Sequence, residues 1–365
     1  MCPIGESELS PSPRSRLAEL REGAWEAGDS GSPPDVPPPW LDRQMFDRAR
    51  HLFKMYFFSI FFSHLSGLML IVHLPSMTDT LLSTGHSSSV VSLFRRYLST
   101  LIHIRHWYEG DIWDVDDPAH QSITHVRAMH RRVADRLNDG NQSESQPEAT
   151  PENDSPRPIL SVIDKPRPNT PKNNVLKDRV AISQYDMALT QFAFVGLVIM
   201  NPKHVGLPLN RNDLKCLVHF WRAIGYMLGV EDRYNLCNEG LDEAINTCKD
   251  ILECELKPSL SNASKDSSVM SKGIIQAMNS FIIFLSWEAM ARFWYEKFNL
   301  KVGFPMGAYE KVGYWLMRFT FGWLLRWQVF HSFFNFLLRI AVRQALNRKE
   351  YFEGWLIRRY KLDSM

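Results

Sequence analysis

The 365-residue chain has little cysteine and almost no excess charge. Its five cysteines are an odd number, and none of them forms a C-x-x-C pair. This usage excludes a disulfide framework and favours a reducing compartment. Lysine and arginine number 42 against 40 acidic residues. The formal net charge of +2 gives no overall argument for a nucleic-acid partner, and we expect none.

Several common catalytic and targeting motifs are also missing. The chain has no phosphate-binding G-x-x-x-x-G-K-[ST] loop, no dinucleotide fingerprint, no H-E-x-x-H zinc helix and no G-x-S-x-G nucleophile elbow. No E-x-x-H pair points to a di-iron carboxylate bundle. The first residues, MCPIGESELSPSPRSRL, lack an apolar core, so we expect no signal peptide. What remains is chemistry built on isolated histidines.

The alternation of apolar and polar residues that is typical of β-strands is absent as well. Apolar residues instead recur at helical spacing in most of the chain. The helical stretches cover residues 40–74, 87–108, 116–137, 183–200, 212–230, 241–256 and 269–298, and a long apolar C-terminal region follows. Helix starts are expected at the serines before Val90, at Asp117 with Pro118, at Ser183 and near Asn212. The sequence therefore predicts an all-α fold.

Two polar stretches interrupt this pattern. The N-terminal residues and the segment after residue 137 are rich in proline, serine, glycine and charge, and they show no apolar period. Such segments bury too little apolar surface to offset the entropy of ordering. We predict a disordered tail over residues 1–40 and one helical domain over 41–362, interrupted by a disordered insertion at about 138–177. A linker between two domains is the alternative for the second segment.

Two long apolar segments raise the question of a membrane. Residues 55–74 carry no Asp, Glu, Lys or Arg and have about the length of a bilayer span, but two histidines and several serines suit a buried helix equally well. Residues 314–342 are rich in aromatics and contain three arginines, which are costly at a bilayer centre. This composition suits an interfacial helix better. A basic C-terminal segment follows. We therefore expect a membrane surface as a partner.

Two of the twelve histidines stand out by their position in predicted helices. His130 lies in an apolar stripe with Arg127 one turn before it, and His219 lies in CLVHFWRAIGYML, which is apolar nearly all round. A buried neutral imidazole needs hydrogen-bond partners for both nitrogens, or one partner and a metal. Both histidines are therefore either hydrogen-bonded core residues or metal ligands.

Two arginines, Arg96 and Arg222, also lie in mostly apolar helices. A partly buried guanidinium needs a carboxylate or a phosphate-like group. A haem propionate would serve, and so would Asp186 or Glu288, which lie in apolar helices themselves. An internal salt bridge is the more frequent outcome.

The order of several motifs resembles the ER-bound oxygenase MpaB/rubber oxygenase family, which includes latex clearing protein. The motifs are STGHSSS, RRYLST, HWYEGD, VRAMHRRV, SQYDMALTQFAFVGL and HFWRAIGYMLGVEDRYN, and the resemblance covers roughly residues 45–300. It implies an all-α protein that holds one haem b and uses dioxygen on an apolar, isoprenoid or lipid-like substrate. It also implies membrane association, at the endoplasmic reticulum with the domain on the cytosolic side. A cytoplasmic location is the alternative.

The resemblance also implies site residues. The axial histidine of the family lies in an R-x-x-H helix, which here is Arg127 to His130. His130 is thus implied as the iron ligand, and Arg127 as part of the haem site. The preceding helix of the family carries an arginine and a threonine four residues later, which here are Arg96 and Thr100, and both are implied in catalysis.

The remaining correspondences concern the polar residues of the pocket. Thr190 falls at a cofactor-binding position and His219 at a catalytic one. The rubber oxygenases have a distal lysine where this chain has Ser99. Only Asp79 lies near the position of the family's acidic residue, so no catalytic base is assigned.

Two other functions are compatible with these residues. The first is a non-catalytic haem- or lipid-binding protein on the same scaffold, which the missing distal lysine favours. The second is a membrane-associated helical scaffold without a cofactor, in which His130 is an ordinary core residue. Fold resemblance alone does not decide between an enzyme and a binding protein.

Overall fold

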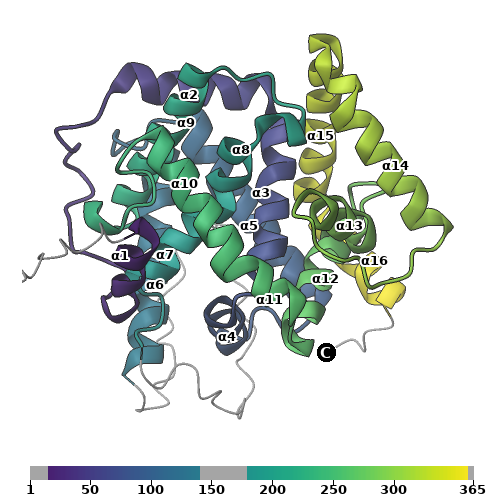
Figure 1. Ribbon diagram of the computed structural model, residues 1–365, viewed down its shortest axis with the longest axis horizontal. Coiled ribbons are helices and arrows are strands. Elements are labelled where there is room, and N and C mark those ends of the chain that lie inside the picture. The colour runs from purple at the N-terminus through teal and green to yellow at the C-terminus, as the bar shows by residue number, and fades with distance from the viewer. Residues whose placement is uncertain (1–14, 140–178, 361–365) are drawn as a thin grey trace, which may run out of the picture.

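The structure is a computed structural model that describes residues 15–139 and 179–360 (Figure 1). Within these ranges the chain forms helices and a single isolated β-bridge, between Ala27 and Ser183. The prediction of an all-α fold is therefore confirmed. The predicted insertion at about 138–177 lies almost wholly outside the described residues.

The helices follow one another along the whole described chain. The α-helices are α1 (Arg16–Glu22), α2 (Arg43–Met55), α3 (Phe57–Ile71), α4 (Pro75–Ser83), α5 (Val90–Glu109), α6 (Pro118–Asn138), α7 (Gln184–Gln191), α8 (Leu197–Met200), α9 (Arg211–Met227), α10 (Leu241–Ile251), α11 (Lys257–Ser261), α12 (Lys265–Asn279), α13 (Trp287–Lys297), α14 (Ala308–Gly322), α15 (Gln328–Asn347) and α16 (Lys349–Tyr360). Short 3₁₀ turns are η1 (Gly23–Trp25), η4 (Pro202–Val205), η5 (Asp232–Tyr234) and η7 (Leu324–Arg326), and π-helical turns are η3 (Phe192–Gly196) and η6 (Leu252–Leu256).

Helix α3 lies at the centre of the molecule (Figure 1). It contacts α2, η3, α8, α12 and α15, and all of its residues except Phe58 and Leu68 are buried. The apolar segment 55–74 therefore contains a core helix. Within the described chain no single helix is both long and apolar enough to cross a membrane. Only α2 and α3 together have the required length and composition, and they are bent by 97° relative to each other.

A glycine allows α3 to approach η3 closely. A Cβ atom on Gly67 would lie 1.7 Å from the Ala193 carbonyl oxygen, so a larger residue would push the two elements apart. The turn η3 is π-helical, a feature that often occurs at functional sites.

Helix starts follow the local capping residues. Ser89 forms a capping box with Ser92, the Asp117 side chain accepts from the Ala119 N–H, and Ser183 forms a capping box with Asp186. Each such cap satisfies N–H groups that have no partner inside the helix. These three predicted starts are confirmed, whereas the helix predicted to start near Asn212 is capped by Asn210, two residues earlier.

Two expectations from the sequence differ from the structure. The prediction of disorder over residues 1–40 does not hold for residues 15–40, which include α1 with Leu17 and Leu20 buried in the core, and residues 1–14 lie outside the described residues. The helical stretch 269–298 divides into α12 and α13. Between them Phe284 has a positive φ of 63°, and Ser286 caps the second helix.

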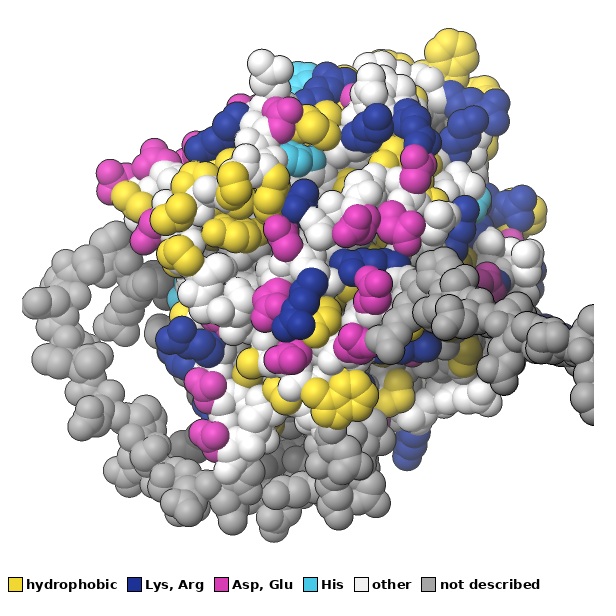
Figure 2. Space-filling model, turned by 60° about the vertical axis from the view of Figure 1, so that its left-hand side comes forward, with side chains coloured by type: hydrophobic (Ala, Val, Ile, Leu, Met, Phe, Trp, Pro, Cys, Tyr) yellow, Lys and Arg dark blue, Asp and Glu magenta, His cyan; other side chains and the backbone are white. Residues whose placement is uncertain are grey.

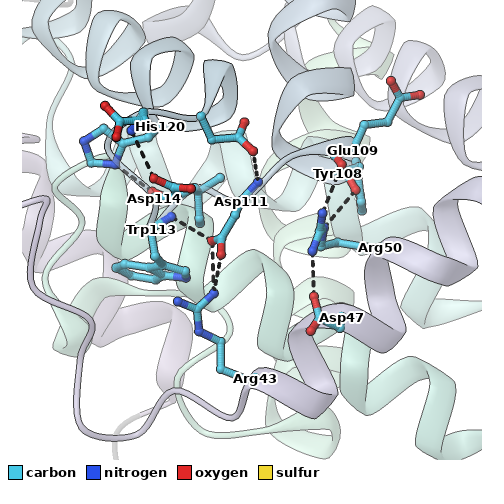
Figure 3. A network of polar contacts seen from close by, with 12 residues as sticks. Arg43, Asp47, Arg50, Tyr108, Glu109, Asp111, Trp113, Asp114 and His120 are labelled. Atoms are coloured by element: carbon cyan, nitrogen blue, oxygen red, sulfur yellow. Dashed lines mark hydrogen bonds and ion pairs between the residues drawn. The ribbon is translucent and has the colours of Figure 1, made fainter.

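The turn between α5 and α6 is tied to α2 by a polar network (Figure 3). Arg50 of α2 donates to the carbonyls of Tyr108 and Glu109 at 3.2 and 3.0 Å. Arg43 donates to both carboxylate oxygens of Asp111 at 3.0 Å. This turn joins α5 and α6, which pack against each other. The network therefore fixes the end of α5 and the start of the turn relative to α2.

Candidate functional site

His130 lies on α6 with its Nδ1 atom buried. No hydrogen-bond partner for Nδ1 occurs among the described residues. Burial lowers the pKa of His130 to about 4, and the nearby positive charge of Arg96 contributes to the decrease. The imidazole is therefore neutral at pH 7, which is the form that binds metals.

Arg96 of α5 is a partly buried guanidinium whose side-chain partners among the described residues are hydroxyl groups. Its Nη1 atom donates to Thr84 Oγ1 at 3.1 Å and to Ser87 Oγ at 3.2 Å. No carboxylate of the described chain forms an ion pair with it. Burial lowers the pKa of Arg96, which shows the cost of keeping this charge away from water. The site therefore holds a cation that an anion would stabilise.

Arg222, the second arginine in a mostly apolar helix, forms the internal salt bridge that the sequence analysis gave as the more frequent outcome. Arg222 pairs with Asp232 at 3.3 Å, and it lies over the ring of Trp40 at 3.9 Å. The two acids named as possible partners are engaged elsewhere, since Asp186 pairs with Arg179 at 3.2 Å and Glu288 with Lys272 at 2.7 Å. Of the two arginines, only Arg96 lacks a carboxylate within the described chain.

Two further histidines lie on the same pair of helices. The rings of His103 on α5 and His125 on α6 are stacked 6.0 Å apart. Ser122 Oγ bonds to His103 Nδ1 at 2.7 Å and accepts from the Trp107 indole at 3.1 Å. Burial lowers the pKa of His103 to about 4, and the charges of His125 and other histidines, His130 among them, contribute to the decrease. The sequence reasoning did not single out this pair, because its signal is the packing of two helices and not a spacing within one.

An apolar cavity lies between α3 and α5. The cavity is small, with an enclosed volume of about 30 Å³. It is lined by Phe53, Phe57, Phe61, His64, Leu65, Leu68, Tyr97, Thr100, Leu101, Ile104, Phe194 and Met278. The predicted site residue Thr100 is therefore on the cavity wall. Its hydroxyl donates to the Arg96 carbonyl at 3.0 Å and keeps the capacity to accept.

Arg127 lies one turn before His130, but its guanidinium binds the N-terminal segment. Its Nε and Nη2 atoms donate to the Asp29 carboxylate, the former at 3.0 Å, and its Nη1 atom donates to the Ser32 carbonyl at 2.8 Å. Both members of the ion pair are largely buried. This contact holds α6 against residues far away in the sequence.

The other two predicted site residues are engaged outside the cavity wall. Thr190 Oγ1 donates to the Asp186 carbonyl at 2.8 Å within α7. His219 Nε2 accepts from the Asp42 N–H at 2.9 Å and packs edge-on against Trp40 at 5.7 Å. Since Asp42 is the N-cap of α2, His219 supports the start of that helix.

The residues around His130 fit a haem better than a bare metal ion. The described part of the chain contains no group of three His, Cys, Asp or Glu side chains that could hold a metal ion. A haem iron needs only one protein imidazole. The neutral His130 can bind iron, and Arg96, which lacks a carboxylate, can pair with a propionate. The structure brings these two residues together across α5 and α6.

Comparison with known proteins identifies the family of the chain. Residues 55–296 match the sequence model of the family described as "ER-bound oxygenase mpaB/B'/Rubber oxygenase, catalytic domain". No curated protein sequence matches the chain. The fold is similar to the structure of latex clearing protein in the closed state, with a TM-score of 0.53 and 18% identity. That similarity covers 89% of this chain and 84% of the other, and at this identity it shows the fold alone.

Proposed function

Because the chain belongs to the MpaB/rubber oxygenase family of oxygenases, we propose that it is a haem b-dependent oxidoreductase that uses dioxygen, with His130 as the axial iron ligand. One observation carries the proposal. Among the described residues, the Nδ1 atom of the neutral His130 has no hydrogen-bond partner, and the nearby guanidinium of Arg96 has no carboxylate. A haem would satisfy both groups, one through its iron and one through a propionate.

The chain's own residues would bind the substrate and exclude water. The bound haem supplies an iron with an open position for dioxygen. His130 needs to lose no proton to bind iron at neutral pH, because burial holds its pKa at about 4. The apolar wall between α3 and α5 suits an isoprenoid or lipid-like substrate, and its rings keep water away from the reacting centre.

The other predicted site residues take supporting roles in this proposal. Through Asp29 and Ser32, Arg127 would position α6 and therefore His130. The contacts of Thr190 and His219 support helix α7 and the start of α2. Their roles in cofactor binding and catalysis stay predictions, as does the role of Thr100, which has the most direct access to the cavity.

The C-terminal hairpin supports the part of the proposal that concerns a membrane. Helices α14 and α15 lie at one edge of the molecule (right in Figure 1). Most of their large apolar side chains, and those of the turn between them, are exposed: Tyr309, Val312, Trp315, Leu316, Phe319, Trp323, Trp327, Val329, Phe333, Phe336, Leu337 and Ile340. We call this set the aromatic surface. Soluble monomers rarely expose so many large apolar side chains together.

The charges around the aromatic surface favour anionic lipid as its partner. Between Glu310 and Glu350 the chain contains no acidic residue. The basic residues of the same stretch are Lys311, Arg318, Arg326, Arg339, Arg343, Arg348 and Lys349. Exposed tryptophan and phenylalanine with arginine at the edges are typical of surfaces that lie in the headgroup region. We therefore infer peripheral binding to an anionic membrane, and the description of the family as ER-bound supports the endoplasmic reticulum.

The absorption spectrum of the purified full-length protein tests the proposal. Protein expressed with haem precursor should show a Soret band, and the pyridine haemochrome should identify haem b. His130→Ala should lose or strongly shift the band, whereas the control His51→Ala, at an exposed position of α2, should keep it. A folded wild-type protein that takes up no haem would contradict the proposal. If the protein binds haem, oxygen consumption with an isoprenoid substrate separates an oxygenase from a non-catalytic haem protein.

A further inference from the structure

Residues 29–40, which we call the N-terminal strap, bind to α6 and to the end of α9. The ion pair between Asp29 and Arg127 holds the start of the strap against α6. The Ser30 N–H donates to the carbonyl of Gly229, just after α9, at 2.8 Å. The strap therefore joins two helices through residues that are far apart in the sequence.

The imidazole of His120 on α6 makes a further contact with the strap. His120 is 6% exposed and lies beside the turn between α5 and α6 (Figure 3). Its Nδ1 atom lies 2.8 Å from the carbonyl oxygen of Ile112, and its Nε2 atom lies 3.2 Å from the carboxylate of Asp35 in the strap. Both partners can only accept a hydrogen bond, because a carbonyl and an ionised carboxylate carry no proton.

These two acceptors set the protonation state of the ring. A neutral imidazole carries one N–H and can donate to one of them only, so its bare nitrogen would face the lone pairs of the other. The imidazolium form donates at both nitrogens. His331 is the contrasting case: its Nε2 atom bonds to the Leu325 carbonyl at 2.9 Å, and its Nδ1 atom has no partner among the described residues, which suits a neutral ring. The contact between His120 and Asp35 therefore depends on a proton.

Most of the charged groups around His120 are acidic. The charged and titratable groups on the elements packed around it are Asp29 and Asp35 of the strap, Asp111, Asp114, Asp116 and Asp117 of the turn, His106 of α5, Arg43 of α2, Tyr226 of α9 and Arg127 of α6. Both arginines of this set are already paired, with Asp111 and Asp29. Burial lowers the pKa of His106, so its ring adds no positive charge at pH 7. The other four carboxylates favour a proton on His120.

The two bonds of His120 differ in what replaces them when the proton is lost. The carbonyl of the fully buried Ile112 would be left without a donor, which is costly. The Asp35 side chain is 65% exposed, so water can solvate its carboxylate at once. The neutral ring therefore keeps the bond to Ile112 and gives up the bond to Asp35.

We propose that His120 holds the N-terminal strap in a proton-dependent way: the imidazolium binds Asp35, and the neutral ring releases it. An imidazole changes its charge between about pH 5 and 8, so the strap is held at mildly acidic pH and loosened at alkaline pH. The ion pair of Asp29 and Arg127 keeps its charges over this range. Since Arg127 lies one turn before His130, the strap links pH to the haem site if the proposed function holds, but its release does not depend on haem.

Hydrogen exchange of the strap amides in the full-length protein tests this inference. The amides of residues 30–32 are all hydrogen-bonded, and a substitution at Asp35 does not alter their chemical exchange rates. At pH 6 they should exchange about threefold faster in Asp35→Ala than in wild type, as expected for an ion pair with one exposed partner. At pH 8.5 the two proteins should exchange at the same rate. A ratio that is the same at both pH values, whether it is one or larger, would overturn the proposal.

Variants of His120 identify the group that carries the proton. His120→Gln keeps a donor that does not titrate. Adding Asp35→Ala to His120→Gln should therefore have the same effect at pH 6 and pH 8.5, and a remaining pH dependence would assign the proton to another group. The control His51→Gln, at an exposed position of α2, should keep the wild-type response. If His120→Gln does not fold, wild type and Asp35→Ala still decide the question. No haem signal enters the measurement, so its outcome is independent of the haem assignment.

Discussion

Helix α3 and the hairpin of α14 and α15 are similar in composition and opposite in environment. Both are rich in phenylalanine and other apolar residues, but α3 is almost completely buried while the hairpin exposes the aromatic surface. The two regions touch: Phe58 of α3 stacks on Phe334 of α15 at 4.9 Å, and Asn335 Oδ1 accepts from the Phe58 N–H at 2.8 Å. The inner face of the hairpin is thus covered by the core. Its outer face has no neighbour among the described residues.

The charges of the surface sharpen this comparison. On the face shown in Figure 2, basic and acidic side chains are interspersed, as is common for a solvated surface. The hairpin has basic residues without acidic ones between Glu310 and Glu350. Apolar composition alone therefore does not decide burial. The number of neighbouring elements decides it. Of the basic residues of the hairpin, Arg318 and Arg339 pair with Glu296 and Glu109 of neighbouring helices.

The largest expected difference between the two regions is in stability. Phe62→Ala, in α3, should lower the free energy of unfolding by about 3–5 kcal/mol, because Phe62 packs against Phe293 and Phe321 in the core. Phe336→Ala, at a position that is 60% exposed on α15, should change it by less than about 0.5 kcal/mol. Urea denaturation measures both. Similar losses for the two variants would contradict the contrast in burial.

The pH dependence of stability should also differ between a histidine of α3 and an exposed one. The unfolded His64 side chain binds a proton near its ordinary pKa of 6.5, and burial lowers the pKa of the folded one to about 3. Below pH 6.5 the unfolded state binds a proton on His64 that the folded state does not bind. The contribution of this group to the free energy of unfolding is therefore full above pH 6.5 and falls by about 2 kcal/mol between pH 7 and 5. The variant His64→Leu should therefore lose less stability than wild type over this range, whereas His51→Leu should match wild type. Identical slopes in urea midpoints for His64→Leu and wild type would refute the prediction.

Membrane binding should depend on the aromatic surface. Replacing Trp315, Phe319 and Trp323 by serine should weaken binding to phosphatidylcholine/phosphatidylserine vesicles at least about tenfold, since buried apolar area drives interfacial binding. Vesicle sedimentation measures the effect, and an unchanged unfolding midpoint shows that the variant is folded. Serine at the exposed Trp25 and Val115, outside the hairpin, is the matched control. Unchanged vesicle binding would show that lipid is not the partner of this surface. If the serine variant instead turned a dimer into a monomer, the partner would be a second copy of the chain.

The smallest expected effect concerns a single charge on the hairpin. Arg343→Gln should weaken binding to vesicles that contain phosphatidylserine by about 1 kcal/mol, and it should leave binding to pure phosphatidylcholine unchanged. Arg132→Gln, at an exposed position of α6, should change neither. The difference between the two arginine variants should disappear at high salt, because salt screens exposed charges. A salt-independent loss would point to a folding defect instead.

Much of the architecture could be predicted from local sequence. Ser89, Asp117 and Ser183 cap the helices that they were expected to start, because a capping side chain bonds to N–H groups within three residues. The stretch 269–298 was not divided correctly, because the break at Phe284 carries no glycine or proline signal. The candidate site was predicted only in part. Periodicity and the family motif pointed to His130, but neither could show which arginine lacks a carboxylate.

Taken alone, the sequence determined the all-α class, the helix starts and the family, because these depend on neighbouring residues and on motif order. Only the tertiary structure decided which polar groups are left without partners. His219 bonds to Asp42, which is 177 residues away, and Arg127 bonds to Asp29, which is 98 residues away. Arg96, in contrast, meets no carboxylate among the described residues, and its guanidinium bonds to two hydroxyl groups. A hydrogen bond depends on a separation of about 3 Å in space, and distance along the chain does not encode it.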